Sequence, residues 1–89
     1  MFFVGLAKFR KKPSKELMET AGKLADSPPP GIKVHNVFWT LGRFDSVIIF
    51  EAPNEKEAMK MALPVSDYMA TETLVALPRE EALKLAETI

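Results

Sequence analysis

Two apolar runs separated by a short polar turn dominate the middle of the sequence. The first covers residues 34–41 and the second residues 46–52, and both are rich in β-branched and aromatic side chains, which favour strands. Between them lies Gly42-Arg43-Phe44-Asp45. Two strand-like runs joined by a few residues that include a glycine predict a β-hairpin.

Two further segments have the composition of strands. Phe2–Phe9 is apolar on both faces, as expected of a central strand, and Met69–Leu77 alternates between two sets of side chains. The three prolines at residues 28–30 cannot donate hydrogen bonds, so they predict a stiff connection before the hairpin.

Three segments carry apolar residues at helical spacing. The first begins at Lys12-Pro13-Ser14, with Pro13 as its first helical residue. The second follows a capping box of Asn54 and Glu57 and ends near Pro64, and the third begins after Pro78. Their apolar faces are Leu17, Met18, Ala21, Leu24 and Ala25; Ala58, Met59, Ala62 and Leu63; and Ala82, Leu85, Ala86 and Ile89.

The order strand-helix-strand-strand-helix-strand-helix predicts an α+β fold. It is the ferredoxin-like βαββαβ plan with an extra C-terminal helix. Right-handed crossovers then give a four-stranded antiparallel sheet of order 4-1-3-2 with both main helices on one face. Residues 1–89 form a single domain, because the chain is too short for two separate cores.

The hairpin strands carry large apolar side chains on both faces. On the second hairpin strand one face would be Ser46, Ile48 and Phe50, and the other Val47, Ile49 and Glu51. Two helices cover only one face of a sheet, so apolar surface remains on the other. A second copy packed face to face would cover it, which predicts a homodimer or a higher homo-oligomer. The third helix covering part of this face is the alternative.

Composition excludes several classes of function. The formal net charge is zero, which disfavours nucleic-acid or membrane-surface binding. Without cysteine and with one histidine, the chain has no disulfide and no Cys- or His-rich metal site, so we expect no metal and no cofactor. No run approaches the roughly 20 apolar residues of a membrane span, and positive charges follow the apolar N-terminus, unlike in a signal peptide. We expect a cytoplasmic protein.

The predicted topology gathers three connections at one end of the sheet. They are Phe9–Ser14, Leu41–Asp45 and Ser66–Tyr68, and they bring Arg43, Asp45 and Tyr68 together with Arg10, Lys11, Lys12 and Asp67. A carboxylate or phosphate ligand would bind there, near the N-terminus of the first helix. The alternatives are a solvated cluster of cations, and for Asp45 a role in shaping the turn by accepting backbone N–H bonds.

His35 is the only side chain that titrates near neutral pH when unperturbed. Strand alternation places it on the face of Val37 and Trp39, where it could act as a general base in an apolar cavity or simply be a half-exposed strand residue. Trp39 would either orient a ligand or pack. Glu51 and Glu72 would be buried carboxylates if they lie on the inner face of the sheet.

The hairpin and the last strand resemble the GYD-domain family. The resemblance is carried by residues 38–53 and 71–76 and covers most of the chain; Phe44 stands where the Gly-x-Tyr-Asp signature has tyrosine. A similar turn occurs in the ligand-binding domain of Lrp/AsnC-type regulators. Both resemble the dimeric α/β-barrel superfamily, which includes cofactor-free monooxygenases, isomerases and effector-binding domains.

These observations favour a small oligomeric module. It would bind a small organic or anionic metabolite at or near the dimer interface, through Trp39, Arg43, Asp45 and Tyr68. The alternative is a cofactor-free enzyme of the dimeric-barrel type that uses His35 as its base. RNA binding through the sheet is disfavoured, because the aromatic RNP pattern with basic flanks is absent.

Overall fold

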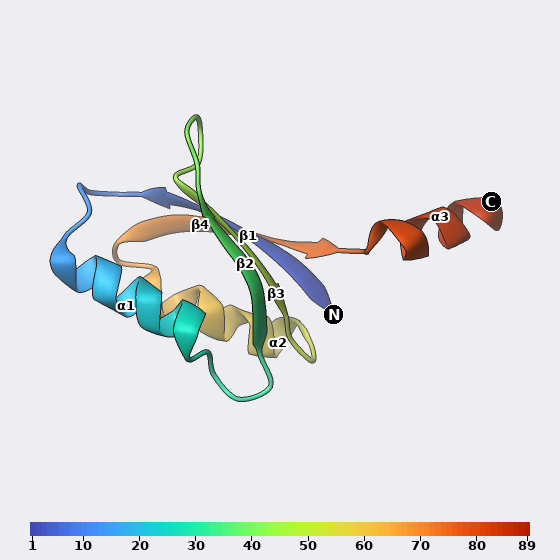
Figure 1. Cartoon of the computed structure of the whole chain (residues 1–89), viewed down its shortest axis with the longest axis horizontal. Coiled ribbons are helices and arrows are strands. Elements are labelled where there is room, and N and C mark those ends of the chain that lie inside the picture. The colour runs from blue at the N-terminus through green and yellow to red at the C-terminus, as the bar shows by residue number, and fades with distance from the viewer.

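The computed structural model describes all 89 residues and contains seven main elements (Figure 1). In chain order they are β1 (Phe2–Phe9), α1 (Lys15–Asp26), β2 (Lys33–Trp39), β3 (Ser46–Glu51), α2 (Glu55–Ala58), β4 (Met69–Ala76) and α3 (Arg79–Glu87). Two short 3₁₀ helices, η1 (Met59–Met61) and η2 (Leu63–Val65), connect α2 to β4. No helix is long and apolar enough to cross a lipid bilayer.

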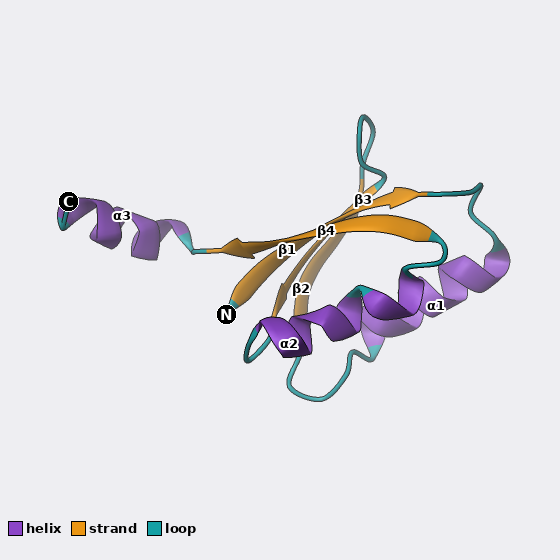
Figure 2. Ribbon diagram, turned by 180° about the vertical axis from the view of Figure 1, so that it is seen from behind, coloured by secondary structure: helices purple, strands orange, loops and turns teal.

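The four strands form one antiparallel sheet with the order β2-β3-β1-β4. This is the predicted 4-1-3-2 order read from the other edge, so the ferredoxin-like prediction is confirmed. Figure 2 shows α1 and α2 on one face of the sheet, whereas the β2–β3 loop rises on the other side. We call the uncovered side the open face.

The first helix begins later than the sequence pattern predicted. Ser14 is the N-cap, and its Oγ accepts the backbone N–H of Leu17 at 3.1 Å. Pro13 therefore precedes the cap rather than filling the first helical position, because a side chain that can bond the free N–H groups defines the helix start more strongly than a favourable φ angle. Leu17 is the buried anchor of this helix.

The second helix winds differently from the prediction. Asn54 caps it as expected, with Oδ1 accepting the N–H of Glu57 at 2.9 Å, but α-helical winding ends at Ala58 and continues as the two 3₁₀ helices. A 3₁₀ helix has three residues per turn, and with the break between the two segments the buried positions are Ala58, Met61 and Val65. The predicted stripe residues Met59 and Leu63 are exposed instead.

The strand register determines which side chains share each face. In the core between sheet and helices, Phe3 and Phe50 are each 1% exposed and their rings stack with centroids 5.4 Å apart. Gly5 lies on the same side, and a Cβ there would lie only 2.7 Å from Cγ2 of Ile48. The missing side chain of Gly5 thus leaves room for the side chain of Ile48 from the neighbouring strand. Opposite it, the middle of the open face consists of Val4, Ile49 and Leu74, which lie in register.

A β-bulge changes the face on which His35 lies. Val34 pairs with Phe50, whereas Asn36 pairs with Ile49, so β2 contains one extra residue between these pairs. An extra residue turns the following side chains by one position relative to the simple alternation. The register of β2 is therefore different before and after His35.

The prediction that His35 shares a face with Val37 and Trp39 is wrong for this reason. The imidazole of His35 lies on the open face, where its Nε2 is 3.2 Å from Oε2 of Glu51 and its ring stacks on Phe2 with centroids 5.4 Å apart. Val37 and Trp39 face α1. The histidine and the tryptophan thus lie on opposite sides of the sheet.

The two glutamates also lie on the open face. Glu51 pairs with Phe2, and Glu72 pairs with Leu6, in the row of side chains that points away from the helices. Glu51 is half-buried and Glu72 is exposed. Neither is a buried carboxylate of the inner face.

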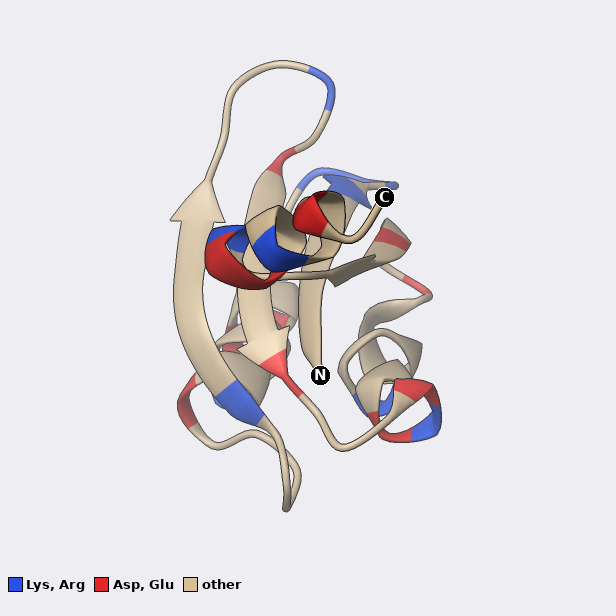
Figure 3. Ribbon diagram, turned by 90° about the vertical axis from the view of Figure 1, so that its right-hand side faces the viewer, with Lys and Arg blue, Asp and Glu red and all other residues tan.

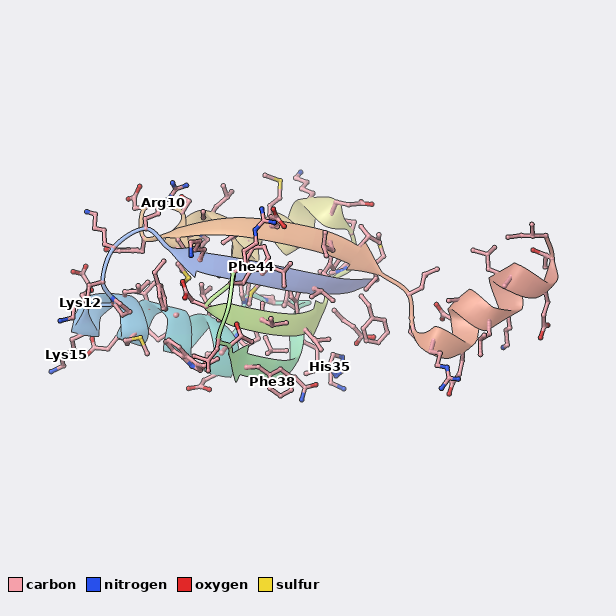
Figure 4. The ribbon with its side chains drawn as sticks, turned by 90° about the horizontal axis from the view of Figure 1, so that it is seen from above. Arg10, Lys12, Lys15, His35, Phe38 and Phe44 are labelled. Atoms are coloured by element: carbon pink, nitrogen blue, oxygen red, sulfur yellow. The ribbon has the colours of Figure 1, made fainter.

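The third helix covers no part of the sheet. It contains no buried residue, and it extends beyond the sheet in the direction of the last strand (Figures 1 and 2), so that it lies in front of the sheet when the molecule is viewed along its long axis (Figure 3). Figure 4 looks onto the open face, which only the β2–β3 loop overhangs. The alternative that α3 covers this face within one chain is therefore wrong.

Candidate functional site

An apolar cavity lies between the two helix segments and the centre of the sheet. Its volume is about 100 Å³, and it exists because the residues around it are small. Gly5 and Ala7 of β1 and Ser46 of β3 form its base, and Ala21 and Ala25 of α1 form one wall. The opposite wall is formed by Met61, Ala62 and Val65.

A second cavity of about 190 Å³ adjoins the first toward the hairpin end of the sheet. Phe9 and Trp39 lie at this end, with their ring centroids 5.6 Å apart and their planes tilted by 42°. Trp39 remains 58% exposed, so its indole forms part of the entrance and is not a core residue. The two cavities share Ala21, Ala25, Val37, Ser46 and Met69 as lining residues. We call them together the α1 cleft.

The α1 cleft has few polar groups and no charged one. Its polar side chains are the hydroxyls of Ser46, Thr71 and Thr73. The hydroxyls that do bond to the chain belong to other residues, namely Ser14, Thr40, Ser66, Tyr68 and Thr88. The cleft therefore offers apolar surface and three free hydroxyl groups, which is the usual chemistry of a small-molecule site.

Tyr68 lies near the start of α1 and not in the cleft. Its hydroxyl donates to Oε1 of Glu16 at 3.4 Å. The negative charge of Glu16 raises the pKa of the Tyr68 hydroxyl, and partial burial, the hydrogen bond and the charge of Asp67 act in the same direction. Tyr68 is thus held as a neutral hydrogen-bond donor to the helix start.

Replacement of Glu16 by Gln should lower the pKa of Tyr68 toward its ordinary value near 10. A raised pKa means that the fold favours the neutral phenol, so this contribution to stability is present below pH of about 10 and is lost as the pH rises through the raised value. Tyr68 is the single tyrosine of the chain, so absorbance titration of tyrosinate measures it directly. Equal midpoints in the parent and in Glu16→Gln would contradict this role of Glu16.

A comparison with protein-family models shows which family the chain belongs to. The family model described as the GYD domain matches residues 5–86, from the middle of β1 to the end of α3. This chain belongs to the GYD-domain family. No curated protein matches it.

In this GYD domain the signature turn joins the hairpin to the central strand. Gly42 has a φ of 110°, a conformation that favours glycine. Oδ2 of Asp45 accepts the backbone N–H of Phe9 at 2.7 Å, while the N–H of Asp45 donates to the carbonyl of Ala7 at 2.8 Å. Asp45 therefore hydrogen-bonds to the backbone, as predicted by the alternative in which it shapes the turn. It also extends the pairing of β3 with β1 by one residue.

The other residues of the turn do not face a site. The Arg43 guanidinium lies 5.7 Å from the ring centroid of Phe44. The backbone carbonyl of Arg43 accepts a hydrogen bond from Nζ of Lys8 at 3.2 Å. The guanidinium of Arg10 donates from Nε to the carbonyl of Ser66 at 3.1 Å. In the GYD domain of this chain these cations hold the connections at the sheet end, and none of them lines the α1 cleft.

The structure therefore separates the candidate residues. Among them, Trp39 alone lines the cleft; Asp45 is tied to the backbone of Phe9, Tyr68 to Glu16, and His35 lies on the open face. No three His, Asp or Glu side chains lie close enough to hold a metal ion. The sequence analysis missed the small residues that create the cleft, although Ala21, Gly22 and Ala25 on one helix were a visible signal.

Proposed function

We propose that this GYD-domain protein is a homodimer that binds a small, uncharged organic molecule in the α1 cleft. The observation that carries the proposal is the cleft itself. It combines two adjoining cavities, an aromatic entrance and free hydroxyls, and it does so in a chain of only 89 residues. A concave, mainly apolar surface with a few polar groups is the usual form of a small-molecule site.

The lining defines the class of ligand. An apolar cavity of about 150 Å³ accommodates a molecule of the size of benzene, so the α1 cleft matches one or two rings. The absence of a charged lining residue favours a neutral ligand, because burying an unpaired charge is costly. Ser46 and the two threonines would bond one hydroxyl or carbonyl of the ligand. The cleft lies on the side of the sheet opposite the open face, so we place the ligand there and not at the dimer interface.

The homodimer is supported by the open face. Large apolar side chains lie side by side on its four strands, namely Phe2, Val4, Leu6, Phe38, Val47, Ile49 and Leu74, and no helix of the same chain covers them. Contiguous apolar surface of this kind is typical of an interaction site. A second copy with its sheet packed on the first would bury it.

The ligand proposal can be tested with para-bromophenol, whose bromine quenches tryptophan fluorescence. The chain has a single tryptophan, Trp39, at the cleft entrance. We expect saturable quenching with a Kd of about 1 mM or tighter, which is reasonable for eight heavy atoms. In Ala25→Leu the added atoms protrude into the cleft where the two cavities meet, and the Kd should rise at least about tenfold.

A matched variant on the same helix controls for nonspecific effects. Thr20→Leu also adds apolar atoms to α1, but Thr20 lines neither cavity, so its Kd should equal that of the parent. Linear, unsaturable quenching, or equal binding by the parent and Ala25→Leu, would refute the proposed site.

An enzymatic function based on His35 loses its geometric support. The imidazole is paired with Glu51 and stacked on Phe2 on the open face, and it reaches neither cavity. The geometry therefore favours ligand binding in the α1 cleft over catalysis by His35.

A further inference from the structure

We propose that α3 is an arm that docks on a second copy of the chain, against the basic connection between β1 and α1, in a homodimer whose two chains run in opposite directions. This inference rests on the proposed homodimer and names its two-fold operator. It starts from a helix that lacks a partner within its own chain.

The helix α3 is amphipathic but packs against nothing. Leu85 is 56% exposed and Ile89, just beyond the helix end, is fully exposed, and no residue of the helix is buried. Nine residues form a marginal helix in water, because too few hydrogen bonds follow the costly first turn. Docking of the stripe formed by Ala82, Leu85, Ala86 and Ile89 would supply the missing stabilisation.

The open face alone is small for a stable dimer. Four strands about 4.8 Å apart and about 20 Å long cover roughly 400 Å², whereas a standard interface buries about 800 Å² on each partner. An arm that docks beside the paired sheets adds contact area on both copies, since a two-fold operator repeats every contact.

Charge selects the place where α3 docks. The helix carries Glu80, Glu81 and Glu87 against Arg79 and Lys84, which is a net charge of −1. The segment from Lys8 to Lys15 contains five cations and no acid, and Figure 4 shows Arg10, Lys12 and Lys15 at the end of the molecule opposite to α3. The two ends lie far apart in one chain, since the longest extent is 48 Å. They cannot neutralise each other within one copy.

Two face-to-face operators are possible, and they bring different ends together. An axis along the strands would place α3 beside α3 and one basic connection beside the other, so like charges would meet. An axis across the strands, in the plane between the sheets, brings the acidic helix of each copy to the basic connection of its partner. Complementary charges favour the second arrangement, and like charges disfavour the first.

Crosslinking distinguishes the two operators. Because the chain has no cysteine, only the introduced cysteines react. We expect a short bismaleimide to crosslink the double variant Lys12→Cys with Glu81→Cys into covalent dimers. Each single variant should stay uncrosslinked, because the antiparallel operator separates Glu81 from Glu81 and Lys12 from Lys12. Efficient crosslinking of Glu81→Cys alone would overturn the proposal.

A charge exchange provides a second, independent measurement. Reversing Glu80 and Glu81 to Lys should weaken the dimer by about tenfold at low salt, and adding Lys11→Glu with Lys12→Glu should restore it. An unchanged dimer in both variants, or no crosslink in a chain that sedimentation shows to be dimeric, would refute the docking of α3 and leave the homodimer intact. A chain that is monomeric throughout would instead refute the homodimer itself, whereas binding of para-bromophenol tests the α1 cleft separately.

Discussion

Phe50→Ala is expected to lower the free energy of unfolding by about 3–5 kcal/mol. The ring of Phe50 is 1% exposed and stacks on Phe3 in the larger core cluster. A domain of this length has a total stability of roughly 4–13 kcal/mol, so the variant should be partly or wholly unfolded at 37 °C. Urea denaturation followed by circular dichroism measures the loss.

The matched control is Phe38→Ala. Phe38 lies in the neighbouring strand but is 51% exposed within one chain, so in the monomer its loss should cost less than about 1 kcal/mol. Similar destabilisation by both variants at concentrations where the protein is monomeric would show that the core is not where the structure places it.

Ile49→Asp is expected to raise the dissociation constant of the homodimer at least about 100-fold. The side chain lies in the middle of the open face, between Val4 on β1 and Asn36 on β2. The two-fold operator would bury two unpaired carboxylates, which is costly because both lose their hydration. A 100-fold rise in the dissociation constant corresponds to about 2.7 kcal/mol, a modest share of that desolvation cost. Sedimentation equilibrium of the parent and the variant measures the change.

The same substitution at an exposed leucine provides the control. Leu63→Asp changes a residue that is 60% exposed on η2, on the helix side of the sheet, and should leave the dissociation constant unchanged. A monomeric parent protein at micromolar concentration, or a variant Ile49→Asp that associates as tightly as the parent, would contradict a dimer through the open face. Binding of para-bromophenol should persist in Ile49→Asp, because the α1 cleft is on the other side.

The functional residues were harder to predict than the fold. The candidates chosen from the sequence were charged, aromatic or titratable side chains, and Trp39 is the one that lines the cleft. The cleft depends on the small side chains of Ala21 and Ala25, and small residues on a helix show where it can approach a sheet but not which ligand could bind between them. Their effect appears only when a helix and a sheet bring several of them to the same place.

The sequence by itself determined the element order, the antiparallel sheet of order 4-1-3-2, the glycine turn at Gly42 and the membership of the GYD-domain family. The fold follows from local periodicity, turn chemistry and the handedness of crossovers, which act over a few residues or a single connection, whereas the family follows from the resemblance of residues 38–53 and 71–76 to the GYD domain. The tertiary structure alone decided the face of His35, the buried side of the 3₁₀ segments, the existence of the cleft and the direction of α3. These features depend on the exact register and winding of the chain: one inserted residue in β2 changed the face of His35, and a change from α to 3₁₀ winding changed the buried positions after α2.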